Sequence, residues 1–76
     1  MLRVIVTSPE RLIYDGPAER VVCPGEQGTF EILPLHRPLI SRLRRGLLEI
    51  NDKVLPIRGG IARVAEDRVL AVVELE

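Results

Sequence analysis

Residues 23–40 read CPGEQGTFEILPLHRPLI and combine a loop-forming half with an apolar half. Residues 24–28 hold one proline and two glycines, which turn a backbone but do not propagate a helix or a central strand. Residues 30–40 interleave apolar side chains with two prolines and the only histidine of the chain. We therefore expect this stretch to follow a fixed path, which matters either for folding or for a partner.

On both sides of this stretch, apolar and polar residues alternate with a period of two, which is typical of half-buried strands. The expected strands cover residues 2–7, 11–14, 18–23, 28–33, 39–43, 47–50, 54–57, 61–65 and 68–74. The expected turns or breaks lie at Asp15-Gly16, Arg44-Arg45-Gly46, Asn51-Asp52, Gly59-Gly60 and Glu66-Asp67. In the strand over 28–33, the even-numbered positions should face inward. Eight or so short, mostly antiparallel strands indicate an all-β fold, a flattened sandwich or barrel.

Residues 39–50 also fit a helical period, because Leu39, Leu43, Leu47 and Ile50 recur at the spacing of one helix face. Gly46 lies in the middle of that run, and strand-like segments flank it on both sides. We therefore favour strands here.

Composition excludes several classes of function. The 76 residues hold 11 basic and 11 acidic side chains, so broad electrostatic binding to nucleic acid or anionic lipid is not expected. Without tryptophan, and with one Phe and one Tyr, the core must be aliphatic. A single cysteine excludes an internal disulfide and a cysteine-based zinc cluster. No long apolar run or signal peptide is evident. We expect one domain over residues 1–76, without direct membrane insertion, in a soluble protein of a reducing compartment.

No nucleophile elbow, phosphate-binding loop or zinc-protease motif is present. Cys23 and His36 are candidates for a thiol–imidazole pair, but a lone cysteine at a strand end is more often a small buried hydrophobe. Glu26 and Glu31 are candidates, with His36, for a cation site, but their spacing sends them different ways. The sequence therefore predicts no catalytic, cofactor or metal site.

Arg42, Arg44 and Arg45 are candidates for holding a phosphate. No aromatic residue or glycine-rich cradle accompanies them, and runs of charge are usually solvated faces. We expect no small-molecule substrate here.

Residues 21–40 resemble a segment of the epsilon subunit of F-type ATP synthases (called delta in mitochondria), whose usual pattern is V-V-x-P-G-x-x-G-x-x-G-I-L-P-x-H-x-P-L-(L/I). The residues in register are Pro24-Gly25, Gly28, Ile32-Leu33-Pro34, His36 and Pro38-Leu39. Residues 6–16, VTSPERLIYDG, resemble the family's V-x-S-P-E-x-x-(L/F)-(F/Y)-x-G opening. Further matches follow in the family's order over residues 43–50, 58–61 and 68–73.

This resemblance implies a ten-stranded β-sandwich, so about eight to ten strands are expected in all. It implies a non-catalytic subunit of the central stalk, located on the cytoplasmic face of the bacterial inner membrane as a peripheral part of the complex. Such a subunit touches the gamma subunit and the c-ring. It couples ring rotation, driven by proton or sodium flow, to ATP synthesis. The alternative is a stand-alone β-sandwich that binds a protein by adding a strand at an open edge.

Carried over position by position, the resemblance implies two contact regions. The residues implied near gamma are Ser8, His36, Pro38 and Ser41. The residues implied in the loop that faces the c-ring are Glu26, Gln27, Gly28 and Thr29. A simpler reading of His36 is an imidazole that only hydrogen-bonds its own proline-rich loop. Gly59 and Gly60 are expected to serve the backbone and not a contact.

Three features depart from the family pattern. Glu31 and Leu35 stand where glycine is usual, which leaves the local loop conformation open. The sequence ends at Glu76, whereas typical bacterial members continue into a C-terminal helical hairpin. We expect a naturally short form, in which inhibition of ATP hydrolysis by that hairpin and ATP binding to it are absent.

Overall fold

The computed structural model describes all 76 residues and contains eight strands and no helix. The strands are β1 (Leu2–Thr7), β2 (Leu12–Ala18), β3 (Val21–Gly25), β4 (Gly28–Ile32), β5 (Leu39–Leu43), β6 (Gly46–Ile50), β7 (Lys53–Ala65) and β8 (Arg68–Leu75). The expected all-β fold of eight to ten strands is confirmed, and the helical alternative for residues 39–50 is wrong.

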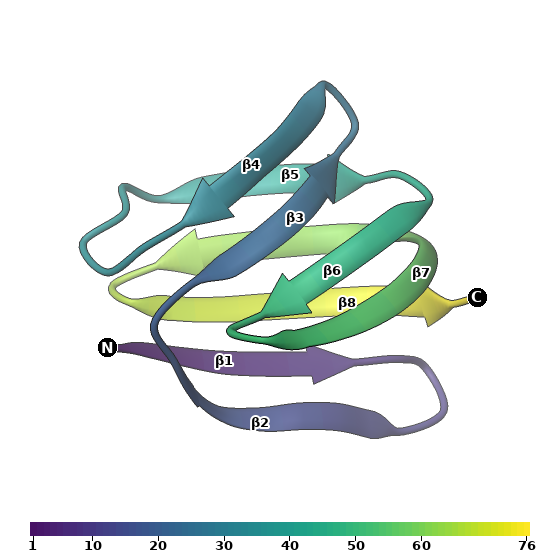
Figure 1. The fold of residues 1–76 in the computed structure, drawn as a ribbon, viewed down its shortest axis with the longest axis horizontal. Coiled ribbons are helices and arrows are strands. Elements are labelled where there is room, and N and C mark those ends of the chain that lie inside the picture. The colour runs from purple at the N-terminus through teal and green to yellow at the C-terminus, as the bar shows by residue number, and fades with distance from the viewer.

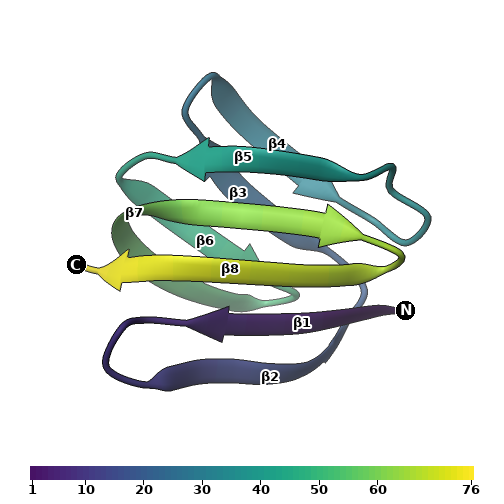
Figure 2. The ribbon, with the colours of Figure 1, turned by 180° about the vertical axis from the view of Figure 1, so that it is seen from behind.

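The strands form two layers that cross at an angle (Figure 1). The five-strand layer has the order β2-β1-β8-β7-β5, and Figure 2 shows it from its outer side. The four-strand layer consists of β4, β3, β6 and the first part of β7. All strand pairs are antiparallel except β1 and β8, which run parallel. A bridge between Gly25 and Leu43 joins β3 to β5, so that β7, β5, β3 and β6 close a small ring.

Strand β7 belongs to both layers. Its residues 53–57 pair with β6, and its residues 60–64 pair with β5, with a shift in register between Ile57 and Gly59. The expected break at Gly59-Gly60 is therefore wrong, because the strand bends there and continues. A Cβ on Gly60 would lie 2.4 Å from the carbonyl oxygen of Val72, so glycine is needed where β8 approaches. The expectation that this glycine pair serves the backbone is confirmed.

The expected turn at Asp15-Gly16 is also wrong, because both residues lie inside β2. Asp15 faces Ile5 across the β1–β2 ladder, and its carboxylate accepts hydrogen bonds from Arg3 at 2.6 and 3.1 Å. Gly16 is buried beneath the ring of Tyr14, whose hydroxyl donates to the carbonyl of Pro17 at 2.6 Å. Long-range pairing therefore overrides the local turn preference.

The core lies between the two layers and is aliphatic, as expected. Sixteen buried side chains form it: Leu2, Val4, Val6, Ala18, Val21, Cys23, Ile32, Leu43, Leu48, Ile50, Ile57, Ala62, Val64, Val69, Ala71 and Val73. The alternation within strands places these residues inward, and the even-numbered positions Phe30 and Ile32 point inward in β4 as expected. The expected turns at Asn51-Asp52 and Glu66-Asp67 are confirmed, with positive φ angles at Asn51, Glu66 and Asp67.

Candidate interaction surfaces

The hairpin between β3 and β4 places Glu26, Gln27, Gly28 and Thr29 together at one exposed tip. Gly25 pairs with Gly28, which leaves Glu26 and Gln27 as the two turn residues. The amide of Glu26 donates to the carbonyl of Arg42 in β5 at 2.9 Å, so the tip is tied to the five-strand layer. A tip that is exposed but held in this way can present a fixed shape to a partner.

Ser8 is buried, with 6% of its surface exposed, in the loop that follows β1. Its hydroxyl accepts hydrogen bonds from the amides of Glu10 and Arg11 at 3.3 and 3.2 Å. The observed role of this side chain is therefore to hold the β1–β2 loop. The prediction that Ser8 lies near gamma stays a prediction, and any contact there would involve the loop and not the hydroxyl.

His36 and Pro38 lie in the loop between β4 and β5. The Nδ1 atom of His36 lies 2.6 Å from the carbonyl oxygen of Arg37, so Nδ1 carries the proton and donates it. The His36 amide donates to the carbonyl of Leu33 at 3.1 Å. These bonds agree with the simpler reading of His36 as a loop residue, while half of the ring edge, at Nε2, remains available to a partner.

Leu35 is a feature of this loop that the residues predicted from the sequence do not include. It has a φ of 70°, in the left-handed region that disfavours side chains other than glycine, and 90% of its surface is exposed. Its amide donates to the carboxylate of Asp67 at 2.7 Å, which holds the conformation. The loop thus keeps the path expected of a glycine while it displays an apolar side chain. The signal in the sequence was a leucine at a position where the family usually has glycine.

Ser41 lies at the centre of β5, half-buried and opposite Ala62 of β7. Its hydroxyl donates to the carbonyl of Arg42 at 3.0 Å. The structure does not gather Ser8, Ser41 and His36 into one cluster. Strands β8 and β7 separate β1 from β5, a distance of about 14 Å, and Ser8 and His36 lie at opposite ends of those strands. The five-strand layer spans the space between them.

Cys23 is fully buried in β3, opposite Phe30, and it belongs to the hydrophobic core. Burial raises the pKa of the Cys23 thiol to about 12, since the thiolate would lose its solvation. A thiol of this kind is a poor nucleophile, and the expectation of a small buried hydrophobe is confirmed.

The Cys23 thiol should therefore resist a maleimide reagent at about pH 8 in the folded protein and react fully in denaturant. Because an unfolded thiol ionises near about pH 8.5, the free energy of unfolding should fall as the pH rises above that value. Mass spectrometry and urea unfolding measure the two effects, and Cys23→Val should remove both. Rapid labelling of the native protein would show that the thiol is accessible.

The other candidate sites lack the arrangement their chemistry requires. No group of three His, Cys, Asp or Glu side chains is placed to hold a metal ion. Glu31 lies in β4 and its carboxylate pairs with Arg20 at 3.1 Å, away from the loop of His36. Arg45 pairs with Glu76 at 3.1 Å, and Arg44 donates to the carbonyl of Arg45. No helix of the structure is long and apolar enough to cross a membrane.

Comparison with known proteins agrees with this fold. A family model described as "ATP synthase, Delta/Epsilon chain, beta-sandwich domain" matches residues 1–74. The chain belongs to this family. Among delta/epsilon relatives, the ATP synthase epsilon chain of Leptospira interrogans is 39% identical over 72 residues, which cover 90% of this chain and 57% of the relative. The epsilon chain of Nitratiruptor sp. is 36% identical over 78 residues, which cover 96% of this chain and 60% of the relative.

Two solved structures share the delta/epsilon fold. A chain of the Euglena gracilis mitochondrial ATP synthase matches with a TM-score of 0.85 at 22% identity, over 95% of this chain and 49% of that one. A chain of the central stalk and c-ring structure of the Tetrahymena thermophila enzyme matches with a TM-score of 0.80 at 16% identity, over 96% of this chain and 63% of that one. This chain spans less than two thirds of the curated relatives and solved chains named here.

Proposed function

We propose that this chain is the non-catalytic epsilon-type subunit of an F-type ATP synthase and couples rotation of the c-ring to ATP synthesis. Its membership of the delta/epsilon family carries the proposal. The geometry supports it, because the two contact regions implied by the family pattern lie at different ends of the molecule. The tip at Glu26–Thr29 follows β3, whereas the loop of His36 and Pro38 follows β4, which runs back along β3.

The two regions suit different partners. We place the exposed Glu26–Thr29 tip against the polar loops of the c-ring, and we place the His36–Pro38 loop and Ser41 against gamma. The length of β4, five residues or about 16 Å, separates the two regions. A packed aliphatic core between them has few soft modes, so a displacement at one contact is transmitted to the other.

This placement locates the protein on the cytoplasmic face of a bacterial inner membrane, as a peripheral part of the ATP synthase. It requires no cofactor or metal. The ion that drives rotation, proton or sodium, is selected elsewhere in such a complex. The test is co-purification with the head assembly of the same organism's enzyme, after that assembly has been prepared without its epsilon subunit. A stoichiometric complex supports the proposal, while a monomer that binds only an unrelated extended peptide supports the stand-alone module.

His36→Ala should weaken binding to the head assembly about tenfold, the scale expected for a half-buried polar residue at an interface. The thermal midpoint should change by no more than about 3 °C, because the ring bonds only its own loop. Biolayer interferometry and circular dichroism measure the two quantities. Asp52→Ala, in the exposed turn between β6 and β7, is the control for both. A large drop in midpoint with unchanged affinity would instead assign His36 a structural role.

A further inference from the structure

The outer face of the five-strand layer exposes a strip of apolar side chains. Ile40 of β5 and Ile61 of β7 are 71% and 52% exposed, and Leu70 and Val72 of β8 are also exposed. Ile61 lies opposite Val72, and Leu70 lies opposite Ile5 of β1. The strip therefore crosses four adjacent strands without interruption. Contiguous exposed apolar surface of this kind marks an interaction site more often than scattered single residues do.

Arginines border this strip. Arg63 lies between Leu70 and Ile40, Arg42 lies opposite Ile61, and Arg3 lies opposite Arg68. Like charges at directly opposite positions destabilise a sheet. Arg3 is paired with Asp15, but none of the four ion pairs of the chain includes Arg42, Arg63 or Arg68.

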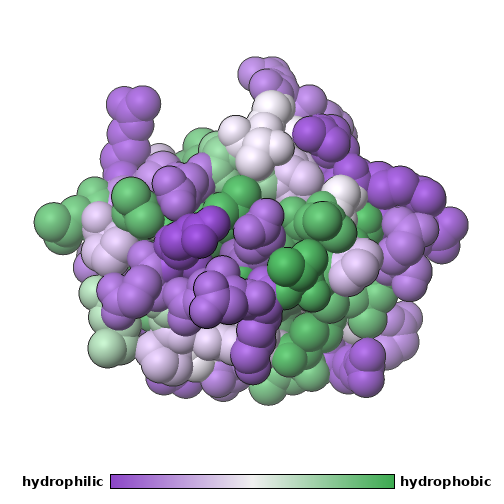
Figure 3. All heavy atoms as spheres, viewed as in Figure 1, coloured by the Kyte–Doolittle hydropathy of each residue, from purple (hydrophilic) through white to green (hydrophobic).

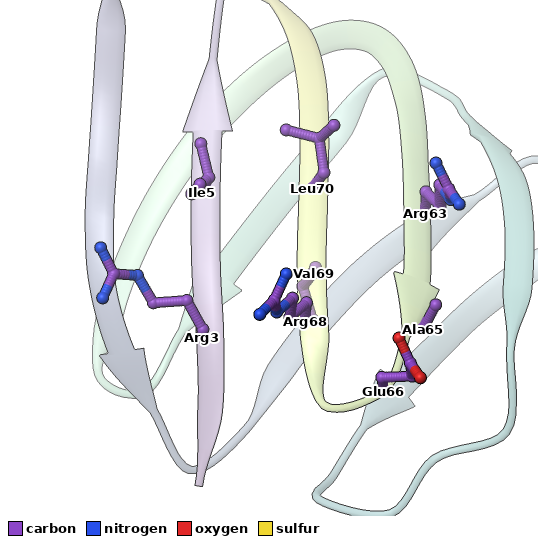
Figure 4. A pocket seen from close by; sticks show the side chains of 8 residues that line it. All are labelled: Arg3, Ile5, Arg63, Ala65, Glu66, Arg68, Val69 and Leu70. Carbon is purple, nitrogen blue, oxygen red and sulfur yellow. The ribbon is translucent and has the colours of Figure 1, made fainter.

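Three of these arginines surround a hollow of about 270 Å³. Figure 4 shows Arg3 and Arg68 on neighbouring strands with Arg63 across from them, and Ile5 and Leu70 between. Glu66, in the β7–β8 turn, is the only acid that lines the hollow. The hollow therefore combines an apolar floor with guanidinium groups that have no carboxylate partner within the chain, apart from Arg3.

The opposite layer is built differently. Arg20 pairs there with Glu31 of β4 at 3.1 Å and with Glu49 of β6 at 3.7 Å. On that face, hydrophilic side chains cover much of the view (Figure 3). The chain is neutral as a whole, so the concentration of unpaired arginines on the outer face of the five-strand layer is a property of that face.

We infer that this outer face docks a surface of the gamma subunit in which an apolar strip is edged by carboxylates. The apolar strip would bury Ile40, Ile61 and Val72, while the carboxylates would pair with Arg63 and Arg68 and relieve the unpaired charge. The face also spans the distance between the separated positions Ser8 and His36. The inference rests on the proposed function and adds the charge and the chemistry of the partner surface.

The test measures binding of the whole chain and its variants to the epsilon-free head assembly at low and high salt. Wild-type affinity should fall as salt rises, because exposed charge pairs are screened. The double variant R63E/R68E should bind at least about tenfold more weakly and should lose most of this salt dependence. Ile61→Asn should weaken binding at both salt concentrations. All three side chains are exposed, so the variants should keep the wild-type thermal midpoint.

R20E/R45E is the matched control, since it reverses two arginines away from the face and should bind like the wild type in spite of its lost ion pairs. Equal affinity of R63E/R68E and the wild type would overturn the inference and leave the proposed function standing. An equal loss in both double variants would overturn it as well, because net charge alone would then explain the effect. Failure of the wild type to bind at all would remove the proposed function and the inference together.

Discussion

Replacing Gly60 by alanine is expected to lower the free energy of unfolding by about 3–5 kcal/mol, the upper range for a single substitution. The added Cβ would lie 2.4 Å from the carbonyl oxygen of Val72 and 2.9 Å from the Cα of Val73. Both contacts are to backbone, so no side chain can rotate to relieve them. Either β8 separates from β7 or the bend in β7 straightens, and each change disrupts the pairing of both layers. Urea denaturation followed by circular dichroism measures the loss.

Gly16→Ala is the matched control for Gly60→Ala. Gly16 is buried too, but a Cβ there would meet only the Tyr14 side chain at 3.5 Å or more, an ordinary van der Waals distance. Its effect should lie within about 1 kcal/mol, with some stabilisation from the less flexible unfolded chain. Similar losses for the two variants would mean that any added methyl group is harmful, and not that β8 approaches β7 closely at Gly60.

Leu48→Ala is expected to lower the free energy of unfolding by about 2–5 kcal/mol. Leu48 is fully buried in β6 and is among the largest side chains of a small core. For a domain of this size the total free energy of unfolding is about 4–11 kcal/mol, so one cavity removes a large share of it. The thermal midpoint should fall by about 10 °C or more.

The neighbouring residue provides the control for this second experiment. Leu47 points to the opposite side of β6 and is 52% exposed, so Leu47→Ala removes the same atoms without leaving a buried cavity. Its effect should stay within about 0.5–1 kcal/mol. Equal losses at positions 47 and 48 would contradict the inward and outward assignment of β6.

The fold follows from short-range pattern to a large extent. Alternation with a period of two places the side chains of β1, β4, β5, β6 and β8 correctly, since one face of each strand is buried. The turns at Asn51-Asp52 and Glu66-Asp67 also depend on local conformation, because these residues tolerate the positive φ that each turn requires.

The errors arise where distant strands decide the outcome. Asp15-Gly16 reads as a turn in isolation, but an arginine twelve residues away pairs with Asp15 in the β1–β2 ladder. Gly59-Gly60 reads as a break, and only the approach of β8 shows that it is a bend within one strand. Leucine at position 35 needs the carboxylate of Asp67, 32 residues further on, to hold its left-handed conformation.

The candidate surfaces divide in the same way. The Glu26–Thr29 tip is contiguous in sequence, so the family pattern is enough to find it. The arginine-bordered face is assembled from β1, β5, β7 and β8, and its residues are neighbours only through the registers of three strand pairs. No pattern along the chain brings Arg3, Arg63 and Arg68 together.

The parallel pairing of β1 with β8 has a mechanical consequence. These strands are the first and the last of the chain, so Met1 and Glu76 extend from opposite ends of one ladder. A force that draws the two termini apart acts along both strands in opposite directions. The hydrogen bonds of the ladder then share the load in shear, and they cannot open one after another as they would in a peeled hairpin. In a rotating assembly, this geometry resists extension of the chain along its strands.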